Sequence, residues 1–384
     1  MPDPSIEPLP LARARDAFMR PERGMYLDFA AHSLRLHAVH RAAQTALDAA
    51  TRPWDASWDA WAAQAERVRL QAALLFDGDP NGVAFVPSAA YGLALAARAL
   101  PLEADEAVLV LDDAFPSNLL PWQQRCGEAG ARLVAVRRGA DATAAVLEPI
   151  EHEPALRTAA LEHTHWHDGG RLDLDLIANA CHARGIALVL DLSQSLGAVP
   201  AEIARWRPAF AVSVGYKWLL GAHGLCVLWA SPHWREHASP IEAHWSAHCA
   251  REDWSFDAAA DNALRPGARR FDAGEIVDVP RLSVAEAALT QLHAWGVDAI
   301  AARLGALTAR LREQVVDSFD MPDVGAPHFV GLRPRHAALD ACVLALRADG
   351  IVCTARHGVL RIAPHLHIDE ADIDRVASVL RAAR

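Results

Sequence analysis

The middle of the chain alternates short apolar runs with stretches in which apolar residues recur every three or four positions. The short runs predict buried β-strands, and the longer stretches predict helices. The predicted strands are Val83–Val86, Ala107–Leu111, Leu133–Val136, Ala159–Glu162, Ile186–Leu190, Phe210–Ser213 and Gly224–Trp229. The predicted helices among them are Ala89–Leu100, Leu119–Gly130 and Leu174–Arg184. Strands without a polar face, alternating with helices, are typical of a doubly wound, mostly parallel α/β sheet that binds ligands at the carboxyl ends of its strands.

The two ends of the chain follow other patterns. Residues 1–25 form a polar start with one short predicted helix, and a helical pattern over His40–Phe76 places Trp54, Trp58 and Trp61 on one face, as in core or interface packing. From Pro280 onward, long helices and short strands predict a small α+β unit. We therefore expect a segment over 1–25 that packs on the small domain, a large α/β domain over 26–279 and a small C-terminal α+β domain over 280–384.

Composition narrows the class of protein. The formal net charge of -11 argues against nucleic acid as the main partner, because phosphate binding needs clustered Lys and Arg. No apolar run approaches the roughly 18 residues that a membrane span needs, and the N-terminus lacks the apolar region of a signal peptide. The six cysteines form no CxxC pair, which disfavours a disulfide framework or a cysteine zinc site. We expect a cytoplasmic protein that binds neither membrane nor nucleic acid.

Three features at strand ends carry candidate chemistry. Asp191 closes the apolar strand that begins at Ile186, Lys217 follows the next strand and is the only lysine in the chain, and Ser88 lies between a strand and a helix. Taken singly, the three residues are most simply a helix cap, a solvated charge and an N-cap. Together they supply what pyridoxal 5′-phosphate (PLP) requires: an amine for a Schiff base, a carboxylate for the pyridinium nitrogen and a helix start for the phosphate.

Several motifs resemble those of the class V aminotransferase family, which includes cysteine desulfurases, kynureninases and isopenicillin N epimerase-like proteins. The similarity runs from about Tyr26 to Val379 and rests on six segments. These are Tyr26-Leu-Asp-Phe-Ala-Ala31, Phe115-Pro-Ser-Asn118, Asp191-Leu-Ser-Gln-Ser-Leu-Gly197, Gly215-Tyr-Lys217, Arg269-Arg-Phe-Asp-Ala-Gly-Glu275 and Leu360-Arg-Ile-Ala-Pro-His365. The resemblance implies the aspartate-aminotransferase fold (PLP fold type I) and a homodimer.

The resemblance also implies residue roles, with Lys217 and Asp191 as the catalytic pair. Lys217 would hold PLP and move the α-proton, and Asp191 would pair with the ring nitrogen. Arg361 would grip a substrate carboxylate in the two-pronged geometry that guanidinium favours, with His32 nearby. The remaining cofactor contacts implied are Ser88, Ala89, Ala90, Phe115, His165, Gln194, Ser213 and Tyr216. The family often has hydroxyl residues where Ala89 and Ala90 stand, so side-chain phosphate contacts are lost there.

The reaction is less determined than the cofactor. We expect a class V aminotransferase-like transferase that acts on a small amino acid or amine, with a PLP-dependent lyase (cysteine desulfurase or selenocysteine lyase-like) or an epimerase as alternatives. A desulfurase needs a reactive thiol on a loop before the C-terminal arginine. Here the only candidate is Cys353, which we expect to lie in a strand as a structural cysteine.

A run of histidines suggests a different class of protein. His163, His165 and His167 alternate, so on an extended strand they would point the same way and could form part of a metal site in a hydrolase. No further ligand set at suitable spacing is evident, and we expect no metal. A non-catalytic protein of the same fold is a third reading, which the presence of Lys217, Asp191 and Arg361 disfavours.

Overall fold

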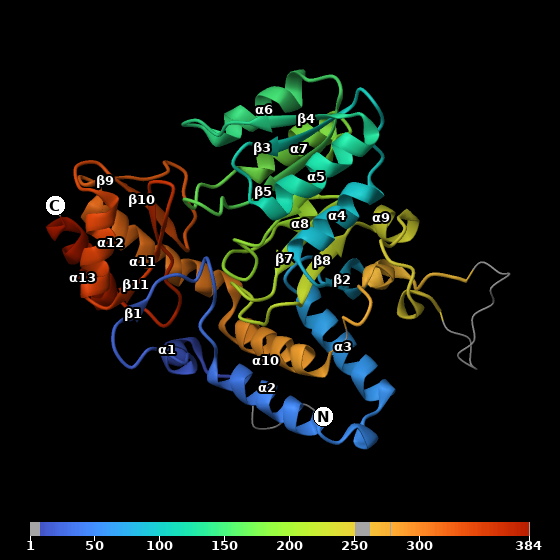
Figure 1. The fold of residues 1–384 in the computed structure, drawn as a ribbon, viewed down its shortest axis with the longest axis horizontal. Helices are drawn as coiled ribbons and strands as arrows, with labels where there is room; N and C mark the ends of the chain where they lie inside the picture. The colour runs from blue at the N-terminus through green and yellow to red at the C-terminus, as the bar shows by residue number, and fades with distance from the viewer. Residues whose placement is uncertain (1–7, 250–261, 277, 384) are drawn as a thin grey trace.

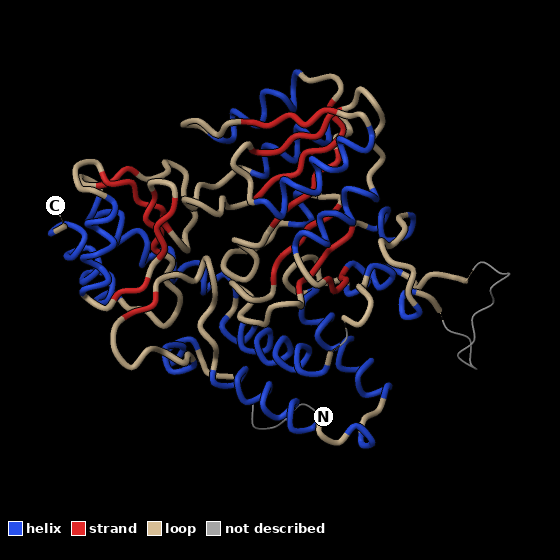
Figure 2. The backbone as a smooth tube through the Cα atoms, in the orientation of Figure 1, coloured by secondary structure: helices blue, strands red, loops and turns tan. Residues whose placement is uncertain are grey.

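The computed structural model describes residues 8–249, 262–276 and 278–383, and its centre is a seven-stranded sheet (Figures 1 and 2). The strand order is β2-β8-β7-β6-β5-β3-β4, and β8 runs antiparallel to both of its neighbours while the other pairs are parallel. The strands are β2 (Val83–Val86), β3 (Ala107–Leu111), β4 (Arg132–Val136), β5 (Leu156–Glu162), β6 (Ala187–Asp191), β7 (Phe210–Val214) and β8 (Cys226–Ala230). The predicted mostly parallel α/β fold is confirmed.

Helices cover both faces of this sheet, because its central strands are apolar on both sides. Along β3, Leu109 packs into one hydrophobic core and its neighbours Val108 and Val110 into another. One core includes side chains of α4 (Ala89–Ala99) and α5 (Pro116–Ala129). The other includes side chains of α6 (Ala142–His152), α7 (Leu174–Ala183) and α10 (Val279–Trp295). The short helices α8 (Ile203–Trp206) and α9 (Pro232–His237) complete this part of the chain.

The C-terminal elements gather to the left of the sheet in Figure 1. A four-stranded antiparallel sheet in the order β12-β13-β10-β9 lies there with three helices. Its strands are β9 (Phe319–Asp320), β10 (Val330–Pro334), β12 (Thr354–Arg356) and β13 (Val359–Ile362). The helices are α11 (Val297–Val315), α12 (Leu339–Ala348) and α13 (Glu370–Ala382).

The start of the chain contacts this C-terminal group. Strand β1 (Met25–Tyr26) pairs in parallel with β11 (Ile351–Val352), and Arg15 of α1 (Ala14–Ala17) forms ion pairs with Asp369 and Asp372. Helix α10, by contrast, packs against α2 (His37–Ala50) and α3 (Trp58–Ala73). The division into 1–25, 26–279 and 280–384 stays a prediction.

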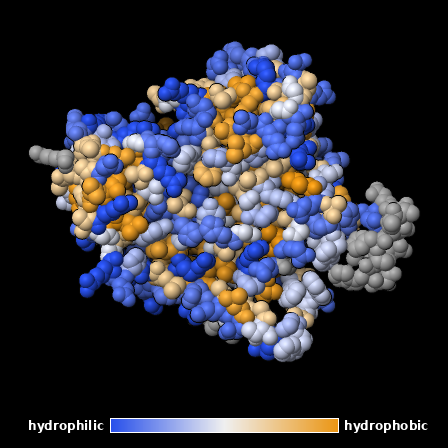
Figure 3. Space-filling view, in the orientation of Figure 1, coloured by the Kyte–Doolittle hydropathy of each residue, from blue (hydrophilic) through white to orange (hydrophobic). Residues whose placement is uncertain are grey.

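The helix predicted over His40–Phe76 is two helices in the structure. Helix α2 ends at Ala50, and the 3-10 turn Pro53–Asp55 separates it from α3, which begins after the N-cap Ser57. Pro53 lacks a backbone donor and forces the break. Trp54 and Trp58 are therefore 76 % and 60 % exposed rather than buried in the core. Polar and apolar side chains are interspersed on the face of the molecule shown in Figure 3, and no described helix is long and apolar enough to span a bilayer.

Candidate active site

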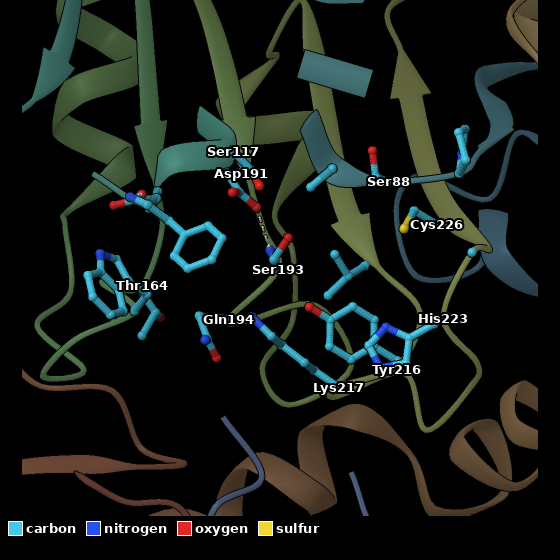
Figure 4. Close-up of a pocket in the computed structure, with 17 residues that line it drawn as sticks. Ser88, Ser117, Thr164, Asp191, Ser193, Gln194, Tyr216, Lys217, His223 and Cys226 are labelled. Carbon is cyan, nitrogen blue, oxygen red and sulfur yellow. Dashed lines mark hydrogen bonds between the residues drawn. The ribbon is translucent and has the colours of Figure 1, made fainter. Parts of the chain in front are cut away.

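A cavity lies at the carboxyl ends of β5, β6 and β7, next to the first turn of α4 (Figure 4). This is the edge of a parallel sheet where α/β proteins bind ligands. Its lining includes seven residues predicted as site residues from the sequence. They are Ser88, Ala89, Phe115, Asp191, Gln194, Tyr216 and Lys217. The fold thus brings together side chains that lie up to 129 residues apart in the chain (Ser88 to Lys217).

Lys217 sits in the turn after β7 and points into the cavity. Its side chain is almost fully buried, and its Nζ lies 5.6 Å from the centroid of the Phe115 ring and 5.8 Å from that of Tyr216. Burial lowers the pKa of Lys217 to about 8, although the nearby Asp191 carboxylate opposes the shift. A substantial fraction of this amine is therefore neutral near physiological pH, which is the form that attacks an aldehyde.

Asp191 is the last residue of β6 and is buried beneath the cavity. Its Oδ1 accepts a hydrogen bond from the backbone N–H of Ser193 at 2.9 Å. Burial raises the pKa of Asp191, and the hydrogen bond with Ser193 and the Lys217 ammonium only partly offset this rise. A cationic ring nitrogen bound in the cavity would supply the counter-charge that this buried carboxylate needs.

Gln194 is held in a fixed orientation. Its Oε1 accepts a hydrogen bond from the indole Nε1 of Trp218 at 3.0 Å, and its Nε2 donates to the carbonyl of Ala30 at 2.8 Å. The amide nitrogen carries two hydrogens, so one N–H is left to face the cavity. This fits the predicted bond to the hydroxyl of a PLP ring.

The first turn of α4 closes the end of the cavity nearest β7. Ser88 is the N-cap and accepts a hydrogen bond from the backbone N–H of Tyr91. Ala89 lines the cavity, and its free N–H points out of the helix start, where anions bind readily. Two other predicted phosphate contacts do not line it: Ala90, in the same turn, and Ser213, whose hydroxyl lies within 3.4 Å of the Leu192 and Val214 carbonyls.

The histidine run does not form a metal site. The ring of His163 packs against Trp206 at 4.9 Å, His165 is held by Asp113 and Asp168, and His167 contacts the carbonyl of Arg356. The strand ends at Glu162, so the three side chains do not alternate on an extended backbone and diverge. Among the described residues, no three His, Cys, Asp or Glu side chains could hold a metal. The described residues therefore give no support to the metallohydrolase alternative.

His165 does not line the cavity, whereas its neighbour Trp166 does. Burial disfavours a charge on His165, but hydrogen bonds to Asp113 and Asp168 outweigh burial and raise its pKa to about 9. Arg138 bridges the same two carboxylates. This charged network packs behind the wall of the cavity. The structure therefore gives no support to the predicted contact of His165 with the cofactor.

Neither of the two predicted substrate residues lines the cavity, but each contacts a residue that does. Arg361 is buried on β13, where its Nη2 pairs with Asp28 at 3.0 Å and its Nη1 donates to the carbonyl of Trp166. Its Nε has no partner among the described residues. His32 contacts His223, with 3.2 Å between their nitrogens, and His223 stacks on Tyr216 with ring centroids 3.7 Å apart.

Sequence reasoning missed part of the lining. The lining residues not predicted from the sequence are Pro87, Ser117, Glu162, Thr164, Trp166, Ser193, Val214, His223, Gly224 and Cys226. Glu162 could have been found from the sequence, because it ends an apolar strand as Asp191 does. Ser117 in the first turn of α5, Val214 at the end of β7 and Cys226 at the start of β8 lie on regular elements. The remaining residues lie on loops whose direction depends on the tertiary fold.

The fold has close counterparts among solved structures. The chain is similar to the cysteine desulfurase CsdA of Escherichia coli, with a TM-score of 0.82, 19% identity and coverage of 98% of this chain and 99% of that one. It is also similar to a variant of C-DES with glycine covalently linked to the PLP cofactor, with a TM-score of 0.84, 18% identity and coverage of 96% and 99%. The fold is therefore that of PLP fold type I, and the cavity holds the lysine and the carboxylate that PLP requires.

The family follows from the sequence comparison. The class V aminotransferase family matches residues 25–330, so the chain belongs to this family of PLP-dependent enzymes. Kynureninase of Deinococcus radiodurans is 28% identical, over 97% of this chain and 93% of that protein. Isopenicillin N epimerase of Streptomyces clavuligerus is 27% identical over 82% and 83%, and the uncharacterized aminotransferase YcbU of Bacillus subtilis 26% over 84% and 85%. These names span different reactions, so membership identifies the cofactor and leaves the reaction open.

Proposed function

We propose that this enzyme acts on a small amino acid or amine at the cavity around Lys217, as a class V aminotransferase-like transferase. The observation that carries the proposal is the convergence of Lys217, Asp191 and Gln194 on one buried site. Lys217 would bind the cofactor, and the first turn of α4 at Ser88 would hold its phosphate. Bound PLP supplies an electron sink for a substrate carbanion.

The chain's own residues would then orient and move protons. Asp191, buried and short of a cation, would keep the cofactor's ring nitrogen protonated. Phe115 would cover one face of the ring, since its own ring lies close to the Lys217 Nζ. Lys217, with a pKa lowered by burial to about 8, would carry the α-proton to and from the substrate, because such an amine both accepts and releases a proton near neutrality.

Substrate binding is assigned to Arg361 and His32. A guanidinium whose Nε has no partner among the described residues can still meet a carboxylate, while Asp28 holds its other end. On this assignment, Arg361→Gln raises KM for a carboxylate substrate and leaves the absorbance of bound PLP unchanged.

A persulfide route is disfavoured by the state of the thiols. Cys353 lies between β11 and β12, and burial raises its pKa to about 11; burial also raises the pKa of the cavity-lining Cys226 to about 11. Neither thiol is a ready thiolate at neutral pH. Elimination or epimerisation that needs no protein thiol remains the alternative.

We further infer a homodimer that works in the cytoplasm. The exposed Trp54 and Trp58, together with Trp245 at 42 % exposure, form an aromatic surface suited to a protein partner. The ring of Trp58 lies 5.9 Å from that of Trp245, so these two rings adjoin. All six cysteines are free thiols, which suits a reducing compartment.

The first experiment is the visible spectrum of the purified protein before and after borohydride, followed by peptide mapping. A yellow protein whose reduced adduct maps to Lys217 supports the proposal, and single amino acids that bleach the colour then sort transamination from elimination. Lys217→Ala should fold normally, with no imine and no turnover. A wild-type protein that stays colourless with added PLP, or turnover by Lys217→Ala, contradicts it.

A further inference from the structure

A second acidic side chain reaches the cofactor cavity beside Asp191. Glu162 ends β5 and pairs in register with Asp191 at the end of the neighbouring strand β6. Its side chain is 4 % exposed and lines the cavity. Two carboxyl groups therefore flank one small buried site, whereas a pyridine ring offers a single nitrogen to pair with.

The two oxygens of Glu162 differ in their surroundings. Oε1 accepts a hydrogen bond from the backbone N–H of Phe115 at 2.7 Å. Oε2 is buried and has no hydrogen-bond partner among the described residues. Leaving an ionised oxygen buried without a donor is costly, whereas a protonated Oε2 becomes a donor that needs an acceptor. The described part of the protein offers none, so the acceptor is expected in the cavity.

The nearby cations are already matched by other carboxylates. His165 Nε2 lies 3.9 Å from Glu162 Oε2, beyond hydrogen-bond distance, and its two nitrogens face Asp113 at 3.2 Å and Asp168 at 3.5 Å. Arg138 pairs with the same two aspartates. Two cations thus balance two carboxylates. With the ring nitrogen of PLP opposite Asp191, Glu162 is the carboxyl group of this set that has no cation within hydrogen-bond distance of its Oε2 among the described residues.

The electrostatics agree with this count. Burial raises the pKa of Glu162 to about 7, and the Asp191 and Asp113 carboxylates add to the rise. His165 and the Phe115 N–H oppose it without reversing it. The groups that face Glu162 are therefore Asp191 from β6, Asp113 from the β3 end and His165 from its own segment. Lys217, across the cavity, also interacts with Glu162, because the Glu162 carboxyl group raises the pKa of Lys217.

The order of the strands indicates which edge of the cofactor Glu162 meets. Strand β7, before the Lys217 turn, lies on one side of β6, and β5 lies on the other. In PLP the phosphate arm and the ring hydroxyl stand on opposite sides of the line from the nitrogen to the aldehyde carbon. A ring whose nitrogen meets Asp191 and whose phosphate meets the Ser88 turn therefore directs toward β5 the edge that carries its methyl group and its hydroxyl.

We propose that Glu162 is a positioning residue that holds a proton on Oε2 and donates it in a hydrogen bond to the hydroxyl oxygen of bound PLP. This rests on the cofactor placement proposed above. The bond stabilises negative charge on that oxygen. This charge is greatest once the Schiff-base nitrogen that joins Lys217 to the cofactor has lost its proton. Glu162 therefore lowers the pH midpoint at which the visible colour of the PLP-bound enzyme changes.

The test is a pH titration of the visible spectrum of the PLP-bound wild type, Glu162→Ala and Glu162→Gln. The alanine variant should raise the midpoint by about one pH unit or more, because it loses a hydrogen bond to a charged group. The glutamine variant keeps an N–H donor and should stay within about 0.3 unit of wild type. Glu148→Gln, an exposed glutamate on α6, is the matched control and should not shift the midpoint.

The sign of the shift decides the outcome. A midpoint that falls in either Glu162 variant means that Glu162 is ionised, and an unchanged midpoint in Glu162→Ala means that it does not meet the ring; each overturns the proposal. If Glu162→Ala does not fold, infrared difference spectra of wild type against Glu162→Gln replace it, and a wild type without the carboxylic-acid band overturns the proposal. Borohydride mapping on the same samples separates this failure from loss of the cofactor assignment, because Lys217 would still be labelled.

Discussion

At the scale of single residues, burial decides the chemistry of this site. Lys217 and Asp191 are an ordinary amine and carboxylate by type, yet desolvation shifts the pKa of the first down and of the second up. Both shifts reduce the charge that the buried site must carry. A cationic cofactor ring would lower the pKa of Asp191 again, so binding of the cofactor and ionisation of Asp191 are coupled.

The lowered pKa of Lys217 predicts the pH dependence of cofactor attachment. Only the neutral amine attacks the PLP aldehyde, so its rate in cofactor-free protein should rise with pH and level off above about 8. A lysine in water would keep gaining reactivity toward its ordinary pKa of 10.5. Stopped-flow absorbance between about pH 6 and 10 measures this, and a rate still climbing steeply at the alkaline end would contradict the lowered pKa.

At the scale of elements, two loops after β6 and β7 hold the site together. Gly197 has a φ of +92° in the loop that follows Asp191, and a Cβ there would lie 2.6 Å from the carbonyl oxygen of Trp218, next to Lys217. Only glycine allows both the backbone conformation and the close approach. The indole of Trp218 then orients Gln194 through the 3.0 Å hydrogen bond.

Gly197→Ala should therefore destabilise the enzyme by about 1–3 kcal/mol. It should also weaken PLP binding, because the added Cβ would push apart the loops that carry Asp191 and Lys217. Gly127→Ala on α5 is the matched control: nothing lies within 4 Å of its added Cβ, and alanine favours a helix by up to about 1 kcal/mol. Urea unfolding and PLP titration of both variants measure the contrast. Equal stability of the two variants would show that the loops adapt freely.

At the scale of the whole molecule, a group of uncharged histidines lies in the core around Phe18, Phe29 and Trp218. His365 stacks on Phe29 with ring centroids 4.5 Å apart, and His328 packs edge-on against Trp218 at 4.5 Å. The Nε2 of His367 lies 2.7 Å from the Tyr26 carbonyl oxygen. Imidazole rings here act as apolar packing material, which holds only while they stay neutral.

This core predicts a loss of stability in mild acid. Burial lowers the pKa of His163 and His328 to about 3, that of His367 to about 4 and that of His365 well below 6.5. Between about pH 6.5 and 4 the unfolded chain binds protons that the folded chain does not, so stability present above about pH 6.5 falls by about 1.4 kcal/mol per pH unit for each histidine. Urea unfolding at about pH 7 and about pH 5 measures this. In His367→Gln the free energy of unfolding should change less steeply with pH. A pH dependence equal to that of wild type would show that His367 does not contribute to the loss of stability in acid.

The aromatic surface around Trp54 and Trp58 predicts where two copies of the chain meet. Replacing both with serine should weaken a homodimer at least about tenfold, because exposed tryptophans contribute strongly when an interface buries them. Leu344→Ser, on α12 and 64 % exposed, is the matched control outside this surface. Sedimentation velocity across a dilution series measures both. A dimer that is weakened equally by the two changes, or by neither, would place the interface elsewhere.

Local sequence determined the strands, the reactive residues at their ends and the cofactor. Apolar runs such as Val83–Val86 and Ala107–Leu111 match β2 and β3 residue for residue, because a strand buried on both faces leaves a pattern that needs no tertiary context. Lys217 stood out as the only lysine, and Asp191 as a charge closing an apolar run.

Only the tertiary structure decided which charges meet. Arg361 pairs with Asp28, 333 residues away, and His165 is held by Asp113, while Glu162 lies beside Asp191 through sheet register alone. A carboxyl or imidazole group takes its charge from its burial and its neighbours, and both are properties of the folded packing. The histidine run therefore suggested metal ligands from the sequence alone. In the folded protein it packs behind the cavity, where His165 belongs to a network of charged side chains.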